Sequence, residues 1–247
     1  MTLIRTLWFY ALLVPSTMVF SFIAICGGVL KSRAVCKWVE RNWSAFTLWT
    51  VGVRVEADLA ALPEKGPLVV IANHQSQFDI FLLFYVLARY PLSFVAKKSL
   101  FRIPLLGPAM LAAGHVPIDR ANNREAMKAM NVAAERAQQG FCPVVFPEGT
   151  RQTDTSRLGE FKTGGSILAI KTGAPIAPVI IHGSGGILPA NGFMLGKNRR
   201  VTVRALEPIS PGAYTLKQRD QLSSDLHDIM SGAYRDLASK HTGDPTP

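Results

Sequence analysis

The sequence predicts an α/β domain with a mostly parallel central sheet flanked by helices, preceded by an N-terminal membrane-associated helical hairpin. From residue 51 onward, short apolar runs alternate with longer segments of helical spacing, which is typical of βαβ units. Before them, 25 consecutive uncharged residues run from Thr6 to Leu30. The chain is 48% hydrophobic and only 18% charged, which is apolar for a soluble enzyme and too polar for a transporter with many spans.

The uncharged N-terminal segment is long enough for a membrane helix. Twenty-five helical residues extend about 37 Å, against about 30 Å for the hydrocarbon core of a bilayer. Pro15 and the Gly27–Gly28 pair are expected to kink or fray this helix. We therefore expect a membrane helix or a half-buried hairpin here, and a cleaved signal peptide and a buried core helix remain as alternatives. Four basic residues in the segment 31–41 follow the apolar run, and they favour a cytoplasmic position for the rest of the chain.

Residues 34–50 have apolar side chains at helical spacing, three of them tryptophans. This spacing predicts an amphipathic helix whose apolar stripe either packs on the protein or lies in the membrane interface. We therefore expect membrane-associated helices over residues 1–50, one catalytic domain over 51–240, and a frayed tail over 241–247.

Each element of the expected domain follows from its own pattern. Strands are expected at seven places, from alternation or from short apolar runs: 51–57, 67–73, 92–96, 115–119, 142–149, 176–183 and 201–206. Helices are expected at 78–90, 103–114, 123–139, 164–173 and 217–240. Asn122 is the expected N-cap of the third of these helices, and Gly140 ends it.

The formal net charge of +10 suggests an anionic partner. The basic residues form small scattered groups without an aromatic-interleaved strand, so we do not expect nucleic-acid binding. The three cysteines form no CxxC pair and no HExxH motif is present. A disulfide framework and a structural metal site are therefore not expected. No motif in the chain indicates a bound cofactor.

The segment "IANHQSQFDI", residues 71–80, carries the first chemical motif. An apolar strand ends near Asn73, and Ser76 is the expected N-cap of the helix that follows. His74 then lies in the strand-to-helix turn and Asp79 in the first helical turn. A carboxylate there can accept the imidazole N–H, so that the other ring nitrogen can act as a base. A structural turn is the alternative interpretation.

Two further motifs also end apolar strands. In "VVFPEGTRQ", Gly149 permits a tight turn that exposes backbone N–H groups. Arg151 offers a planar donor pair for phosphate or carboxylate, and Glu148 either clamps that arginine or binds a substrate hydroxyl. In "GHVPIDR", Arg120 is another cation at the end of a strand. Ordinary turns closed by ion pairs are the alternative for both.

Taken together, these three motifs resemble the blocks of the glycerolipid acyltransferase family, whose best-known members act on 1-acylglycerol-3-phosphate. The resemblance covers roughly residues 50–210. The first block is matched by Asn73-His74-Gln75-Ser76-x-x-Asp79 and the third by Phe146-Pro147-Glu148-Gly149-Thr150-Arg151, while "APIAPV" at 174–179 is similar to the fourth. The second block departs at Pro117, where family members often carry a bulky apolar residue.

The resemblance implies a membrane-bound enzyme in which His74 is the general base and Asp79 orients it. A free hydroxyl of a lysophospholipid would attack acyl-CoA or acyl-carrier protein, which are substrates and not cofactors. Glu148, Gly149, Thr150 and Arg151 would hold the glycerol-phosphate head group, helped by Arg120. Lys97, Lys98 and Lys162 are lesser phosphate candidates. The backbone N–H groups after His74 are the expected oxyanion donors.

Three alternatives remain at this point. One is the same reaction on another acceptor, such as glycerol-3-phosphate, a different lysophospholipid or an amino-acid lipid. Another is a lipid thioesterase or hydrolase in which the pair His74–Asp79 activates water. The third is a non-enzymatic lipid-binding protein with the same fold. The acyl donor, the length of the acyl chain and the oligomeric state are not encoded in any motif.

Overall fold

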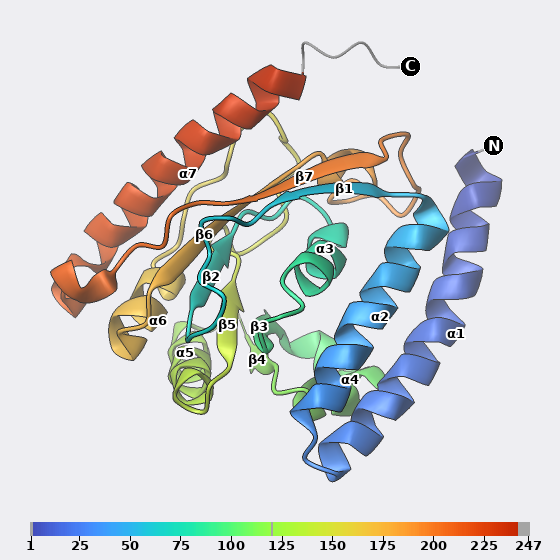
Figure 1. The fold of residues 1–247 in the computed structure, drawn as a ribbon, viewed down its shortest axis with the longest axis horizontal. Coiled ribbons are helices and arrows are strands. Elements are labelled where there is room, and N and C mark those ends of the chain that lie inside the picture. The colour runs from blue at the N-terminus through green and yellow to red at the C-terminus, as the bar shows by residue number, and fades with distance from the viewer. Residues whose placement is uncertain (1, 120, 242–247) are drawn as a thin grey trace.

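The computed structural model describes residues 2–119 and 121–241. Seven strands form one sheet in the order β1-β7-β6-β2-β5-β3-β4 (Figure 1). In chain order the strands are β1 (Arg54–Asp58), β2 (Val69–Ala72), β3 (Leu92–Lys97), β4 (Val116–Ile118), β5 (Cys142–Val145), β6 (Ile176–His182) and β7 (Arg200–Ala205). The pair β6–β7 is antiparallel and the other five neighbouring pairs are parallel. The predicted α/β class with a mostly parallel sheet is therefore confirmed.

Helices cover both faces of this sheet (Figure 1). The bounds of the helices are α1 (Thr2–Val29), α2 (Arg33–Val51), α3 (Phe78–Val86), α4 (Leu106–Ala112), α5 (Asn123–Gln138), α6 (Gly164–Thr172) and α7 (Arg219–His241). One apolar cluster joins α3 and the hairpin α1–α2 to one set of strand side chains, such as Val70 and Val144. A second cluster joins α5, α6 and α7 to the alternate set, such as Val69 and Val145. Every residue of β2 and β5 is buried, as expected for central strands.

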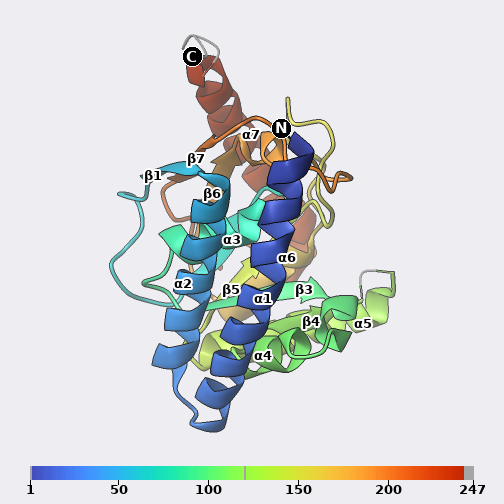
Figure 2. The same ribbon diagram turned by 90° about the vertical axis from the view of Figure 1, so that its right-hand side faces the viewer.

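The N-terminal segment forms a hairpin of two helices that lie side by side (Figure 2). Helix α1 is continuous through Pro15 and ends just after Gly27–Gly28. A Cβ atom on Gly28 would lie 2.4 Å from the Cβ of Ala112, so this glycine permits the close contact between α1 and α4. Neither Pro15 nor the glycine pair interrupts the helix, since both lie inside Thr2–Val29, and the helix ends one residue after Gly28.

Helix α1 is the one helix in the described part of the chain that is long and apolar enough to cross a membrane, judged by length and composition. Of the 18 consecutive residues that form its most apolar stretch, only 17% are buried in the protein. Large apolar side chains are exposed along the whole helix and at Leu30, the residue that follows it. They are Leu3, Ile4, Leu7, Trp8, Val14, Met18, Val19, Phe22, Val29 and Leu30. This single helix is weak evidence for membrane association, and it matches the expected apolar N-terminal region.

Helix α2 divides the predicted apolar stripe between two environments. Val39 is buried, while Trp38 and Trp49 are 52% and 73% exposed. Packing on the protein therefore accounts for only part of the stripe, because Trp38 and Trp49 are exposed on the surface of the protein.

Two element boundaries differ from the sequence predictions for local reasons. The first strand begins at Arg54, because α2 extends to Val51 and Gly52 ends it in a left-handed conformation. The expected helix over 103–114 begins at Leu106 and follows a 3₁₀ turn over Lys98–Arg102. Asn122 caps α5 as predicted, accepting the N–H groups of Arg124 and Glu125.

Candidate active site

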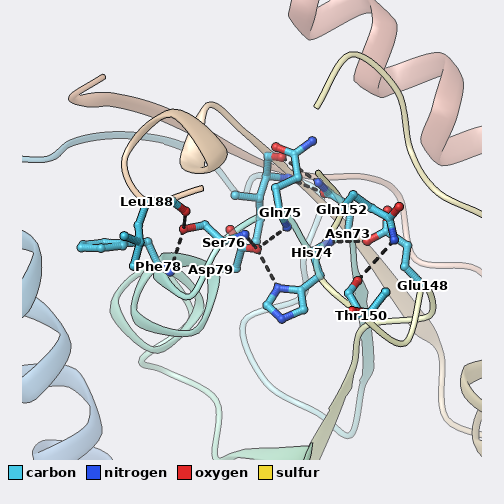
Figure 3. Close-up of polar contacts among 11 residues, drawn as sticks. Asn73, His74, Gln75, Ser76, Phe78, Asp79, Glu148, Thr150, Gln152 and Leu188 are labelled. Atoms are coloured by element: carbon cyan, nitrogen blue, oxygen red, sulfur yellow. Dashed lines mark hydrogen bonds and ion pairs between the residues drawn. The ribbon is translucent and has the colours of Figure 1, made fainter. Parts of the chain in front are cut away.

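The His74–Asp79 pair lies where β2 passes into α3, at the carboxyl edge of the parallel strands (Figure 3). The imidazole Nδ1 is 2.8 Å from Asp79 Oδ2. Because a carboxylate only accepts, Nδ1 carries the ring proton, and Nε2 is left with a lone pair that can take a proton. His74 is 7% exposed and Asp79 is fully buried. The predicted geometry of the pair is confirmed.

The Asp79 carboxylate also fixes the turn that carries the histidine. Its Oδ2 accepts the backbone N–H groups of Gln75 at 2.7 Å and Ser76 at 2.9 Å. The expectation that the N–H groups after His74 form an oxyanion hole is therefore wrong for these two groups, because Asp79 already occupies them. Asp79 lies in the first turn of α3, where the helix dipole stabilises a negative charge.

Ser76 lies two residues before the first residue of α3, whereas an N-cap residue directly precedes the helix. Helix α3 begins at Phe78, so Gln77 occupies the cap position, which corrects the predicted cap. The Ser76 hydroxyl still accepts the N–H of Phe78 at 3.2 Å, and it donates to the carbonyl of Leu188 at 2.7 Å. It therefore both supports the helix start and ties the motif to the loop after β6.

Asn73 anchors the other side of the histidine. Its side-chain amide donates to the carbonyl of Ile181 at 2.8 Å and accepts the N–H of Ile181 at 2.7 Å. This two-bond contact joins the end of β2 to the neighbouring strand β6, and it holds the backbone before His74 in one position.

The segment after β5 holds His74 through both of its backbone groups (Figure 3). Glu148 Oε2 accepts the His74 N–H at 2.7 Å, and the N–H of Gln152 donates to the His74 carbonyl at 2.8 Å. The other oxygen of Glu148 accepts the N–H of Gly159 at 3.0 Å. The two motifs, which both follow apolar strands, therefore lie in direct contact. Sequence reasoning missed Gln152, which follows the motif directly.

Glu148 bonds backbone groups and not the arginine expected beside it. The carboxyl group is 3% exposed, and its burial raises its pKa to about 7, although the N–H groups of Gly159 and His74 partly oppose this shift. With both oxygens used in the loop, the geometry assigns Glu148 a structural contact with the base. Its predicted role in binding a substrate hydroxyl stays a prediction.

Phe146 stacks on the catalytic candidate, and sequence reasoning missed this contact too. The rings of His74 and Phe146 are 3.9 Å apart between centroids and 11° apart in orientation. The signal was present, because Phe146 begins the same motif as Glu148. The stack, together with the Asp79 contact, leaves the imidazole little freedom to rotate.

The turn after Glu148 presents the remaining predicted residues. Gly149 has a φ of 72°, a left-handed conformation that favours glycine. Thr150 is exposed and Arg151 is half-buried. Within residues 2–119 and 121–241, the structure shows no ion pair or hydrogen bond for the Arg151 guanidinium. Arg120, the other predicted arginine, lies outside the described residues.

A cavity of about 520 Å³ adjoins this turn, on the side of the sheet covered by α5 and α6. Its lining is mainly apolar and includes Phe146 and Gly149, with Met127 and Met130 from α5 and Ile167 from α6. The side chain of Lys162 also lines it and passes over Gly149. This volume is within the usual range for a ligand site.

Pro117, where the second block departs from the family pattern, is not among the residues that line this cavity. It is exposed on β4, the edge strand, where a missing N–H costs no sheet hydrogen bond. The next residue, Ile118, lines the cavity instead.

Comparisons with known proteins identify the family of this chain. A family model described as "Acyltransferase" matches residues 53–182, which is slightly more than half of the 247 residues. The 1-acyl-sn-glycerol-3-phosphate acyltransferase of Pseudomonas aeruginosa is 34% identical over 197 residues, covering 77% of this chain and 75% of that protein. The Haemophilus influenzae protein of the same name is 30% identical over 204 residues, with coverages of 82% and 81%.

Longer relatives and a solved structure extend the comparison. A Chlamydomonas reinhardtii protein of that name is 34% identical over 160 residues, and the match covers only 46% of its length. The crystal structure of the 1-acyl-sn-glycerophosphate (LPA) acyltransferase PlsC from Thermotoga maritima aligns with a TM-score of 0.83, 24% identity, and 96% coverage of both chains. That likeness shows the fold. The family model and the two bacterial relatives show that this chain belongs to the acyltransferase family.

Proposed function

We propose that this chain transfers a fatty acyl group from an acyl thioester to the free hydroxyl of 1-acylglycerol-3-phosphate, which gives phosphatidic acid. The observation that carries the proposal is the buried His74–Asp79 pair, whose Nδ1 to Oδ2 distance of 2.8 Å leaves Nε2 as the base. The names of the bacterial relatives support this acceptor. The thioester is that of acyl-CoA or of acyl-carrier protein.

In the proposed reaction, His74 Nε2 takes the proton of the acceptor hydroxyl while Asp79 stabilises the imidazolium. The hydroxyl oxygen forms the new ester bond at the thioester carbonyl, and the carbon–sulfur bond breaks. The departing thiolate then receives the proton from His74. The protein forms no covalent intermediate and needs no cofactor, so the imidazole returns to its starting state after each turnover.

Two cations near the turn after Glu148 support a phosphate-bearing acceptor. Arg151 can present two parallel donors to one phosphate, and the Lys162 side chain passes over Gly149 in the same turn. The cavity of about 520 Å³ offers an apolar site for an acyl chain beside them. Arg120 belongs to the proposed phosphate site on sequence grounds.

The exposed apolar face of α1 supports a membrane-bound enzyme that takes its acceptor from the lipid surface. The basic residues that follow α1 favour a catalytic domain on the cytoplasmic side. The proposed acceptor is a membrane lipid, so a membrane position would bring the site to the phase in which the acceptor concentrates.

The decisive experiment measures thiol release from a long-chain acyl-CoA by the detergent-purified protein, with and without 1-acylglycerol-3-phosphate. We expect release that depends on the acceptor, with phosphatidic acid as the product. His74→Ala should lower the rate on the order of 10²- to 10⁴-fold, the usual contribution of a general base. His227→Ala is the matched control, since this histidine lies on α7 and its side chain is 34% exposed.

Three other outcomes would contradict the proposal in different ways. Release without acceptor would identify a thioesterase. Activity with another acceptor alone would keep the mechanism and change the substrate. Full activity in His74→Ala would remove the proposed base.

A further inference from the structure

A second cavity, of about 320 Å³, lies between the turn of the α1–α2 hairpin and the C-terminal end of α5. Its lining includes Leu92 and Phe141, at or next to the first residues of β3 and β5. Because those strands are parallel to β2, this cavity is at the opposite edge of the sheet from His74. The hairpin turn that borders it is at the bottom of Figures 1 and 2. It is therefore separate from the site described above.

Four basic side chains line this second cavity, namely Lys31, Arg33, Lys37 and Arg136. Three of these side chains, those of Arg33, Arg136 and Lys37, donate hydrogen bonds to neutral groups. Arg33 Nη1 donates to the carbonyl of Gln139 at 2.7 Å, and Arg136 Nη1 donates to the side-chain oxygen of Gln139 at 3.0 Å. The Lys37 ammonium donates to the carbonyl of Arg89 at 2.8 Å.

None of the four has a carboxylate within salt-bridge distance in the part of the chain that the structure describes. Both arginines also lie over the ring of Phe141, at 4.5 Å and 5.8 Å from its centroid, which fixes their guanidinium groups. Positive charges that line one cavity repel one another, and an anion in the cavity would relieve that repulsion.

Glu40 is the acidic member of the described lining, and it does not neutralise this charge fully. Its side chain is 12% exposed, and its carboxylate lies 3.3 Å from Nε2 of the buried His115, so it already has a partner. Burial raises its pKa above the ordinary value, although His115 and Lys37 oppose the shift. The capped N-terminus of α2, where Ser32 accepts the N–H of Val35, adds a partial positive charge.

The apolar surroundings indicate where the anion comes from. Val29 and Leu30, at the hairpin turn beside Lys31, are 78% and 74% exposed, and Leu111 on α4 is 52% exposed. Ala112, next to Leu111, lines the cavity itself. From this arrangement we infer that the cavity binds the phosphate of an anionic phospholipid head group while the neighbouring apolar side chains contact its acyl region. This site does not depend on the proposed reaction.

Vesicle binding by the full-length protein tests this site. We compare vesicles of phosphatidylcholine alone with vesicles that also contain phosphatidylglycerol, using Lys37→Gln/Arg136→Gln as the cavity variant. We expect about fivefold weaker binding to the anionic vesicles for each charge removed, thus roughly 25-fold for the pair. Lys128→Gln/Arg235→Gln removes the same charge from exposed positions on α5 and α7 and should bind as the wild type does.

A second variant and a soluble probe keep the test decisive. Lys31→Asn suits the left-handed conformation at this position, where φ is 51°, and should weaken anionic binding about fivefold without loss of folding. Equal losses in the cavity and control variants would show diffuse charge attraction and overturn the site. Inorganic phosphate is the soluble probe. If it raises the Tm of the wild type but not of the cavity variant, and both proteins bind anionic vesicles equally well, the ligand is a soluble phosphate and the lipid assignment fails.

Discussion

At the scale of single residues, the candidate base is positioned by partners distant in sequence. His74 receives its ring orientation from Asp79, five residues on, but its backbone is held by Glu148 and Gln152. A base that moves by about 1 Å can lose a large part of its effect. Glu148 is therefore as important to the proposed mechanism as a residue that touches substrate.

The raised pKa of Glu148 predicts a pH dependence of stability. Between its ordinary value of 4.5 and its folded value of about 7, the folded protein holds a proton that the unfolded chain releases. The free energy of unfolding should therefore fall as the pH rises through this window, by about 3 kcal/mol in total. Urea unfolding at a series of pH values from 4.5 to 7 measures this slope.

The variant Glu148→Gln should lose this part of the slope. Its absolute stability should also be lower, because an amide has one acceptor oxygen where Glu148 uses two. The change of the free energy of unfolding with pH, and not its absolute value, therefore tests the role of Glu148. Glu64→Gln changes an exposed glutamate and should keep the wild-type slope. An unchanged slope in Glu148→Gln would mean that other groups cause the pH dependence.

At the scale of elements, α7 supports the motif although it lies outside residues 53–182, which match the family model. The hydroxyl of Tyr234 accepts from the Gln75 amide at 2.6 Å and donates to the carbonyl of Thr155 at 2.6 Å. This chain of hydrogen bonds joins α7 to the loop of His74 and to the segment after Arg151. Tyr234 is 1% exposed, so water does not replace it.

Tyr234→Phe should therefore destabilise the protein and slow the reaction. It leaves the buried amide of Gln75 without its partner, which costs about 1–3 kcal/mol. We expect kcat to fall with little change in KM, because the loop of the base shifts while the cavity remains. Tyr85→Phe is the control, since Tyr85 is 42% exposed on α3. Equal thermal unfolding and equal kcat for both variants would contradict this role.

The elements that the sequence predicted well are those with local causes. The cap at Asn122 and the buried runs of β2 and β5 follow from neighbouring residues. The position of β7 between β1 and β6 does not, because strand order depends on pairing between distant segments. The start of α4 was also missed. There, Gly107 approaches the carbonyl of Phe101 so closely that a Cβ atom on residue 107 would lie 2.1 Å from the carbonyl oxygen. This contact depends on the folded backbone, and the residue pattern does not indicate it.

The same distinction applies to the candidate site. The pair His74–Asp79 was predictable because a strand, a turn and a helix start are all local features. The bonds from Glu148 to His74 and from Tyr234 to Gln75 span 74 and 159 residues, and no spacing rule reaches that far. The sequence indicated that each motif follows a strand, but the roles of individual side chains there required the contacts themselves.

At the scale of the whole molecule, the hairpin gives the domain a side on which a membrane can lie. The outer face of α1 carries large apolar side chains that touch little of the protein, among them Trp8 and Phe22 at 62% and 61% exposed. The basic cavity lies at one end of this hairpin, and the proposed catalytic site is at the opposite edge of the sheet. The hairpin would then hold the domain at the surface from which the proposed acceptor is drawn.

Replacing Trp8 and Phe22 by glutamate should therefore weaken membrane binding without unfolding the domain. Charged side chains on this face would have to enter the apolar part of the bilayer, which is costly. We expect the double variant to remain in the supernatant when vesicles are sedimented without detergent. Its Tm should stay close to that of the wild type, because these side chains are mostly exposed.

The matched control adds the same two negative charges at exposed polar positions, Gln138→Glu and Gln218→Glu. This control should sediment with the vesicles. If the Trp8/Phe22 variant also sediments with them, the outer face of α1 is not the membrane face. If its Tm falls sharply instead, that face is packed against protein in solution, and a second copy of the chain becomes the occupant to test by measuring the oligomeric state.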